Sequence, residues 1–314
     1  MRHQDYPLAQ QLWQGLDLFS QQVRSLQGIN NPAYRDSLIE QFVESIRRIR
    51  YVTLISKRSV CDDRADPSSE LFDPEKAAVL RHRQGANDEA FWMVFLSVHF
   101  GKPRKSGWRL VRDIYGRLGD GGYWDWATTS AAPGAFRHWL SANLATLKGG
   151  DGVVRRFGNH RKYQSLHPYA ASGTGDAIES YVSWVKPFTT HDHLIQNAAL
   201  QTNADPRRMF DYLYDSMNAV ASFGRTAKFD YLTMIGKLGL APIEPGSTYM
   251  QGATGPFAGG KLLFDGNTAS NLNRVDLDTL LIRLDSYLNV GMQVIEDALC
   301  NWQKSPGEFK AFKG

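Results

Sequence analysis

Apolar residues recur at helical spacing along nearly the whole chain, and this restricts the fold more than any other feature. The clearest case is a leucine stripe at spacing i, i+3, i+4, i+7, i+11 near the C-terminus, formed by Leu277, Leu280, Leu281, Leu284 and Leu288. Such a stripe is typical of a helix that packs one face against a core. Residues 89–100 are apolar most of the way round, which predicts a central buried helix with Asp88 as its N-cap. Because no series of alternating strands is present, the sequence predicts an all-α fold.

The rest of the chain divides into further helices and two irregular stretches. The same spacing predicts helices over residues 6–27, 32–49, 102–118, 135–147, 176–185 and 191–200. Residues 61–87 are polar and interrupted by prolines, as in a long surface connection, and residues 149–168 are rich in glycine and arginine. We therefore expect a two-lobed helical protein, with an N-terminal segment over residues 1–87 and a core over residues 88–314.

Composition and charge argue against several classes of protein. The chain has 314 residues, of which 42% are hydrophobic and 22% charged, as in ordinary globular proteins, and its net charge of +4 is too mild to demonstrate DNA binding. No apolar run approaches the roughly 20 residues that span a bilayer, and the N-terminus lacks an apolar signal segment. Cys61 and Cys300 form neither a metal-binding pattern nor a disulfide framework. We expect a cytoplasmic monomer without a cofactor, a bound metal or a membrane partner.

Residues 207–250 carry the strongest functional signal: a helix, a tight turn at residues 222–226, a second helix and a Pro-rich loop. The turn places N–H groups at the start of a helix, where an anion such as DNA phosphate is stabilised. We expect Gly224 to adopt a positive φ, and Ser222, Arg225 and Thr226 to contact phosphate with it. The alternative is an ordinary hairpin of two helices in which the glycine ends the first helix.

The run GRTAKFDYLTMIGKLGLAPIEPGSTYM resembles the helix–hairpin–helix DNA glycosylase superfamily, with the hairpin within residues 207–240. In that superfamily a second helix leads to a Pro-rich loop that ends in a catalytic aspartate. The resemblance implies that Lys228 stands where bifunctional members keep a Schiff-base lysine, and that Ser247 and Thr248 lie at the base pocket. The chain departs from the pattern, because the first hairpin glycine is replaced and no carboxylate stands at the matching position of the loop, where Glu244 is the nearest. The catalytic carboxylate therefore remains open among Glu244, Asp230, Asp215 and Asp125.

Several segments together resemble the alpha-glutamyl/putrescinyl thymine pyrophosphorylase family. They are FWMVFLSVHFGK, GWRLVRDIYGRLGD, RRFGNHRKYQSL, FDYLTMIGKLGLAPIEPGSTYMQGATGP and MQVIEDALCNWQKSP. Members are glycosylase-like and belong to phage DNA hypermodification, and bacterial relatives are similar to anti-phage DNA glycosylases that excise glucosylated hydroxymethylcytosine. The resemblance implies that the partner is double-stranded DNA carrying modified bases.

An enzyme that acts on a base within a duplex must flip the base out and fill the gap with a wedge. Tyr123, Trp124 and Trp126, in the aromatic turn GDGGYWDW, are candidates for a wedge or for stacking on the base. The alternative is a structural aromatic cluster between two helices.

The segment 155–163 concentrates hydrogen-bond donors beside a glycine. Asn159 and His160 are candidates for contacts with the flipped base and for catalysis, and Tyr163 for the base pocket. Basic residues of this segment, with one from the basic stretch 102–112, are candidates for phosphate contacts, namely Arg155, Arg156, Arg161, Lys162 and Arg109. The alternative is a solvated loop with ordinary surface charge.

Two other segments are better explained by structure than by ligand binding. His191 and His193 are two residues apart, which places their rings on different faces of a helix, so we expect no metal site there. Thr190 as the N-cap of that helix is the better interpretation. The sequence GATGPFAGGKLLF lacks the order of a phosphate-binding loop, and its small residues indicate close helix packing.

Three functions remain open at this point. The first is a DNA glycosylase that flips and excises a hypermodified pyrimidine in anti-phage defence and leaves an abasic site. The second is a transferase or pyrophosphorylase that acts on an activated hydroxymethyl-pyrimidine in DNA. The third is a DNA-binding adaptor without catalysis, which the missing aspartate favours.

Overall fold

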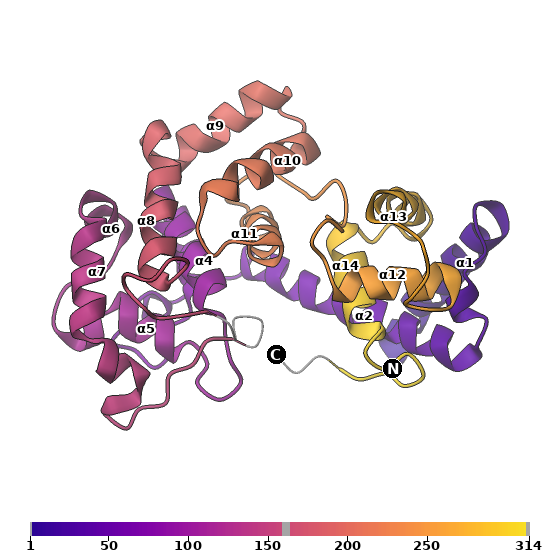
Figure 1. Ribbon diagram of the computed structural model, residues 1–314, viewed down its shortest axis with the longest axis horizontal. Coiled ribbons are helices and arrows are strands. Elements are labelled where there is room, and N and C mark those ends of the chain that lie inside the picture. The colour runs from indigo at the N-terminus through magenta and orange to yellow at the C-terminus, as the bar shows by residue number, and fades with distance from the viewer. Residues whose placement is uncertain (1, 159–163, 312–314) are drawn as a thin grey trace. The chain divides into compact units, whose positions relative to one another are not determined.

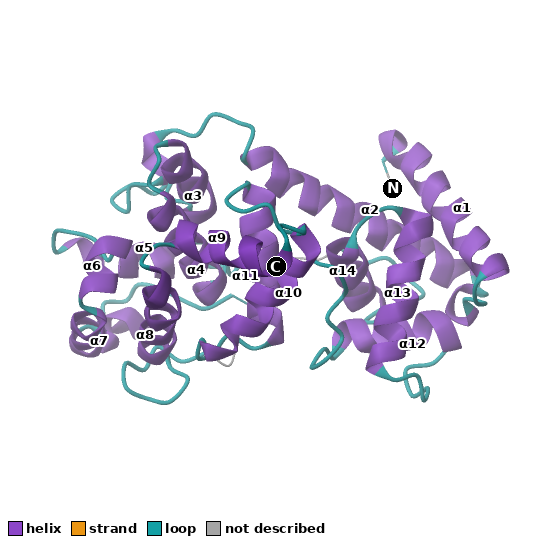
Figure 2. Ribbon diagram, turned by 90° about the horizontal axis from the view of Figure 1, so that it is seen from above, coloured by secondary structure: helices purple, strands orange, loops and turns teal. Residues whose placement is uncertain are grey.

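The computed structural model describes residues 2–158 and 164–311. Within these ranges the chain forms α-helices and short turns of 3-10 or π geometry, and no strand (Figure 2). The prediction of an all-α fold is therefore confirmed. In the part of the chain so described, every helix is too short or too polar to cross a lipid bilayer.

The chain folds into two compact units. Among the described residues, the terminal unit contains those up to Val52 and those from Pro245 to position 311, and the central unit contains Thr53–Glu244. The expected boundary at residue 87 lies inside the central unit, where one of its helices begins.

The helices of the terminal unit surround one apolar core. They are α1 (Tyr6–Gln22), α2 (Pro32–Ile55, which ends just inside the central unit), α12 (Gly255–Asp265), α13 (Arg274–Leu288) and α14 (Met292–Trp302). The leucine stripe lies on α13, where Leu280 is partly buried against this core and the other members are buried, as predicted. The small residues of α12 allow close packing, since a Cβ on Gly259 would come 2.3 Å from the carbonyl oxygen of Leu299 on α14.

The central unit is built around α4, as the sequence predicted. Its helices are α3 (Pro74–Arg83), α4 (Asn87–Phe100), α5 (Arg109–Tyr115), α6 (Trp126–Ala131), α7 (Pro133–Ala142), α8 (Thr174–Val185), α9 (His191–Thr202), α10 (Pro206–Ser216) and α11 (Arg225–Leu238). Every residue of α4 from Ala90 to Phe100 is buried, because α3, α5, α6, α9 and α11 all contact this helix. Figure 1 shows α7 beside α8, and α6 contacts α7.

The prediction of a surface connection over residues 61–87 is wrong for its second half. That part forms α3, which packs on α4 and buries Ala77 and Ala78. Asp73 caps the helix with its side chain and Pro74 occupies the first helical position. A proline that resembles an interruption in the sequence therefore starts a helix.

Three predicted helices are shorter in the structure, and the first of them, expected over residues 6–27, ends at Gln22. The helix expected over residues 102–118 is limited to α5, because Gly107 adopts a positive φ of 52° just before it and Leu118 one of 57° after it. The helix expected over residues 135–147 ends at Ala142, and the chain then forms a separate turn of π geometry.

Candidate functional site

The helix, tight turn and second helix predicted within residues 207–250 are present as α10, a turn and α11. Asp205 caps α10 by accepting hydrogen bonds from two N–H groups of its first turn. Gly224 is the N-cap of α11. The first N–H groups of any helix have no acceptor within the helix, so the start of α11 offers donors to a ligand.

Phe223 holds the start of α11 in place at the surface of the central unit. The Phe223 ring is 4% exposed and stacks on Phe95 of α4, with the ring centroids 4.8 Å apart. The next residue, Gly224, is exposed, and so is Thr226. The Arg225 guanidinium lies 4.9 Å from the centroid of the Phe229 ring. The residues expected to contact phosphate therefore lie together at an accessible helix N-terminus, apart from the core.

The prediction that Gly224 adopts a positive φ is wrong. Gly224 is extended, with a φ of −69°, whereas Ser222 has a φ of 64° and reverses the chain. The Ser222 hydroxyl donates to the carbonyl oxygen of Ser172, which helps to hold this residue in the left-handed region. Glycine at position 224 has another consequence, because a Cβ there would meet no atom of the described residues within 4 Å. The space beside the helix start is therefore open to a ligand.

Lys228 is buried on α11, one turn after this exposed start. It is 6% exposed, and its Nζ donates to Asn218 Oδ1 at 2.6 Å and lies 3.9 Å from the centroid of the Tyr214 ring. Burial lowers the pKa of the Lys228 amine, while the negative charge of Asp215 opposes the shift. A lysine with a lowered pKa carries more of the uncharged, nucleophilic amine near neutral pH.

The four carboxylates left open by the sequence have different surroundings. Asp215 acts electrostatically on Lys228. Asp125 is the N-cap of α6, and Glu244 is 59% exposed and accepts a hydrogen bond from an arginine of α10. Asp230 follows Lys228 by two residues on α11, so it projects from a different face of that helix. Of the four, Asp215 is the carboxylate that the structure couples to the lysine.

The loop that carries Ser247 and Thr248 belongs to the terminal unit. Thr248 is fully buried; its hydroxyl and its N–H both donate to one carboxylate oxygen of Asp278 on α13. The other oxygen of Asp278 accepts from the N–H of Met250 at 2.9 Å. Asp278 thus supplies a carboxylate to the part of the loop where the superfamily pattern has an aspartate and this chain has none. Asp278 could not be predicted from the sequence, because no local pattern links positions 30 residues apart.

The aromatic turn before α6 contributes two rings to the core and one to the surface. Trp124 and Trp126 are 4% and 8% exposed, and the Trp126 ring lies 4.6 Å from the ring of His191. Their burial favours the interpretation as a structural aromatic cluster. Tyr123 is 42% exposed and stacks on Tyr115 with the ring centroids 5.4 Å apart, so it is the member that a nucleic acid can reach.

The basic residues of the segment 155–163 that were predicted to contact phosphate have different surroundings in the structure. The Arg155 side chain is 4% exposed and donates to Asp113 at 2.6 Å and to Asp151 at 2.8 Å, so its donors are already used within the protein. These bonds hold the pKa of Asp151 well below its usual range. Arg156 is exposed, and Arg109 is partly exposed on α5. The other candidates lie outside the described residues: Asn159, His160, Arg161, Lys162 and Tyr163.

A buried chain of hydrogen bonds joins α4, α9, α8 and α11. The Asp88 carboxylate bonds both the N–H and the ring Nδ1 of His191, each at 2.7 Å. His191 Nε2 lies 2.7 Å from the Tyr181 hydroxyl, which lies 2.8 Å from the Tyr231 hydroxyl. The prediction that Asp88 caps α4 is therefore wrong, because this carboxylate binds the start of α9 instead. Thr190 as the N-cap of α9 is confirmed.

Burial determines the protonation of the side chains in this chain of hydrogen bonds. It lowers the pKa of His191, which favours the neutral ring, and it raises the pKa of the two tyrosines. Tyr231 lies on α11 three residues after Lys228, so the chain of hydrogen bonds also fixes the helix that carries the lysine. Within the described residues no group of three or more histidine, cysteine or carboxylate side chains could hold a metal ion.

Residues 33–314 match the family model described as alpha-glutamyl/putrescinyl thymine pyrophosphorylase clade 3. No curated protein and no solved structure matches the chain significantly. Because the matched region includes most of the terminal unit and all of the central unit, the chain belongs to the alpha-glutamyl/putrescinyl thymine pyrophosphorylase family, clade 3.

Proposed function

We propose that the protein is a DNA glycosylase that excises a hypermodified pyrimidine from double-stranded phage DNA, with a glucosylated hydroxymethyl-pyrimidine as the preferred base. The product is DNA with an abasic site, and the setting is anti-phage defence in the cytoplasm. The observation that carries the proposal is Lys228, a buried lysine with a lowered pKa one turn from the exposed start of α11. The family supports an activity on modified pyrimidines, since its name refers to thymine derivatives.

The start of α11 has the donors that hold a DNA strand in this proposal. Its N–H groups, with Arg225 and Thr226, bind a phosphate next to the extruded nucleotide. The open space beside Gly224 lets the phosphate approach the backbone closely. The binding is electrostatic in large part, so it weakens as salt concentration rises.

Lys228 supplies the chemistry. Its flexible side chain leaves Asn218 and the uncharged Nζ attacks C1′ of the sugar; the new C–N bond forms as the bond from C1′ to the base breaks. The electron pair of the broken bond leaves with the base, which takes up a proton. The sugar ring then opens to an imine with Lys228, and water hydrolyses the imine to restore the lysine and release the abasic sugar. Asp215, which acts electrostatically on the lysine, stabilises the positive charge that develops on the sugar as the glycosidic bond breaks.

A second candidate function follows from the family name. A transferase or pyrophosphorylase exchanges the leaving group on an activated hydroxymethyl-pyrimidine for an amine and leaves the glycosidic bond intact. It needs the same flipped base, so the accessible helix start supports it equally. The third candidate, an adaptor without catalysis, needs only the helix start.

One incubation distinguishes the three functions. The purified protein is mixed with phage DNA that carries glucosylated hydroxymethylcytosine, and the products are separated by liquid chromatography and identified by mass. Excision gives a free modified base and an abasic site. A nucleoside of increased mass, tested on DNA with an activated hydroxymethyl-pyrimidine and an amine donor, supports the transferase. Tight binding with no product from any modified DNA contradicts both enzymes and supports the adaptor.

Replacing Gly224 by alanine is expected to weaken binding to duplex DNA several-fold while the free energy of unfolding changes by less than about 1 kcal/mol. The backbone of Gly224 suits alanine and the new Cβ contacts no atom, so the fold tolerates it. The methyl group does occupy the space through which a phosphate reaches the helix start. Gly134→Ala on α7 is the matched control, because a Cβ there also meets nothing within 4 Å. Fluorescence anisotropy with a labelled duplex measures the affinity, and equal affinities for the two variants would contradict the role given to this helix start.

A further inference from the structure

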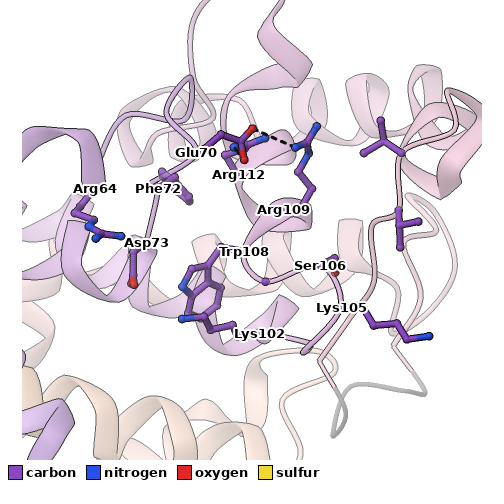
Figure 3. Close-up of a pocket in the computed structure, with 13 residues that line it drawn as sticks. Arg64, Glu70, Phe72, Asp73, Lys102, Lys105, Ser106, Trp108, Arg109 and Arg112 are labelled. Atoms are coloured by element: carbon purple, nitrogen blue, oxygen red, sulfur yellow. Dashed lines mark hydrogen bonds and ion pairs between the residues drawn. The ribbon is translucent and has the colours of Figure 1, made fainter.

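Two adjoining hollows lie on the central unit around Arg109 and Arg112 of α5. The first has a volume of about 460 Å³ and the second about 530 Å³, and both arginines line both hollows. Each volume lies in the range of sites that hold small organic ligands. Basic side chains predominate in the first hollow, where Arg64, Lys102 and Lys105 join the arginine pair (Figure 3). An anionic ligand is therefore favoured.

The arginine pair already binds an anion that belongs to the protein. The Glu70 carboxylate lies 3.3 Å from Arg109 Nη1 and 2.9 Å from Arg112 Nη1, and Figure 3 shows it between the two side chains. Glu70 itself is 80% exposed, so these are surface ion pairs that contribute little to stability. Paired arginines bind carboxylate and phosphate groups with the same forked geometry. A phosphate can therefore take the place of Glu70 at low cost.

A stack of three aromatic rings connects the two hollows. Phe72 lines the first hollow, and its ring centroid lies 5.8 Å from that of Tyr115. The Tyr115 centroid lies 5.4 Å from that of Tyr123, which lines the second hollow. Tyr115 is 1% exposed, whereas Tyr123 is 42% exposed. Because the outermost ring of the stack is accessible, a planar base can continue it.

Other polar groups of the hollows fit a phosphorylated ligand. The Ser106 hydroxyl and the Trp108 indole N–H, both from residues that line the first hollow, are buried and make no hydrogen bond to any residue that the structure describes. In the second hollow Asp151 is paired with Arg155, and Asp113 is paired with Arg155 and with the Nε atoms of Arg109 and Arg112. Asp113 is 11% exposed and stays in place behind the arginine pair, whereas Glu70 is 80% exposed and is the carboxylate that a ligand can displace from the two Nη1 atoms.

We propose that these hollows form a nucleotide-binding subsite, in which a phosphate replaces the Glu70 carboxylate between Arg109 and Arg112 and a base stacks on Tyr123. Glu70 acts as an internal competitor that keeps weak anions out. The identity of the ligand rests on the proposed function, since DNA provides the nucleotides, whereas the subsite is argued from its own residues. An unpaired nucleotide fits best, because a base inside a duplex has no free face to stack on a tyrosine.

The test measures binding of a fluorescein-labelled thymidine octamer by anisotropy. Glu70→Gln is expected to tighten binding about three- to tenfold, because two surface ion pairs no longer compete with the phosphate. The control is Glu308→Gln, which removes the same charge from a residue that is 74% exposed and pairs with Lys310. An equal effect of both variants would show that only net charge matters and would overturn the proposal.

A second pair of variants tests the aromatic platform. Tyr123→Ala is expected to weaken binding of the octamer about tenfold and to remove the quenching of a 2-aminopurine base placed within it, whereas Tyr123→Phe retains both. Equal binding by the two variants would refute stacking on this ring.

Competition with dTMP separates the two sources of the ligand. Displacement of the octamer by dTMP indicates a site for free nucleotides, and no displacement indicates a site for a DNA strand. Base release is scored separately with Lys228→Met, which should bind the octamer normally, so failure of the subsite and failure of the proposed excision give different results.

Discussion

Replacing Lys228 by methionine is expected to lower the rate of base release at least about a hundredfold while DNA binding stays within a factor of about two. Methionine keeps the length and the apolar stem that pack against Tyr214, but it removes the amine that attacks the sugar. The free modified base is quantified by mass in single-turnover reactions, so that product release does not limit the rate. Normal base release by this variant would contradict the role of the lysine.

Two further variants separate the amine from its charge. Lys228→Arg keeps a positive charge but has no nucleophilic amine, so it should lose base release as the methionine variant does. Lys261→Met is the matched control, because Lys261 also lies over an aromatic ring, that of Phe257, with a distance of 4.5 Å from Nζ to the ring centroid. Borohydride added during the reaction should reduce the imine and attach DNA covalently to the wild-type protein. If base is released and no covalent complex forms, a water activated by a carboxylate is the nucleophile instead.

The rate of base release should rise with pH through the lowered pKa of Lys228. Burial disfavours the charged amine, so the uncharged form appears at a lower pH than for a lysine in water, whose pKa is 10.5. The inflection of the single-turnover rate should therefore lie below 10.5, and it should be absent from the small residual rate of Lys228→Met. A rate that falls over the same interval would mean that the charged lysine is the active form.

Replacing His191 by phenylalanine is expected to destabilise the protein by about 3 kcal/mol. His191 is fully buried, and its ring bonds the Asp88 carboxylate on one side and the Tyr181 hydroxyl on the other. Phenylalanine keeps the stacking with Phe91, whose ring centroid is 4.9 Å away, but leaves both polar groups without this partner. The free energy of unfolding in urea measures the effect.

His193→Phe provides the control for this substitution. His193 lies two residues away on α9 and is exposed, so its replacement should cost less than about 0.5 kcal/mol.

The stability of the wild-type protein should depend on pH through His191. Because burial lowers the pKa of His191 below 6.5, the unfolded chain binds a proton at that residue before the folded protein does. The contribution of His191 to the free energy of unfolding should therefore be complete above pH 6.5 and should decrease as the pH falls below 6.5. In His191→Phe this contribution to the pH dependence should be absent. Equal costs for the two histidines would contradict the buried chain of hydrogen bonds.

Local features of the fold could be predicted from the sequence. The buried character of α4, the leucine stripe of α13, the hairpin between α10 and α11 and the Thr190 cap all depend on residues within a few turns of each other. A periodic apolar face or a capping side chain is complete within such a window, so the pattern and the structure agree.

Contacts between distant segments were decided by the tertiary structure. Asp88 binds His191 across 103 positions instead of capping its own helix, and Asp278 reaches a loop 30 residues before it. The burial of Lys228 depends in the same way on how α11 packs against its neighbours. Helical spacing alone could not predict whether this lysine is exposed or buried. The sequence by itself determined many of the helical segments, though not α3, because helix formation is largely a local property. The tertiary structure determined which polar groups lose water and which partners they find, because desolvation and pairing depend on side chains that the chain brings together only when it folds.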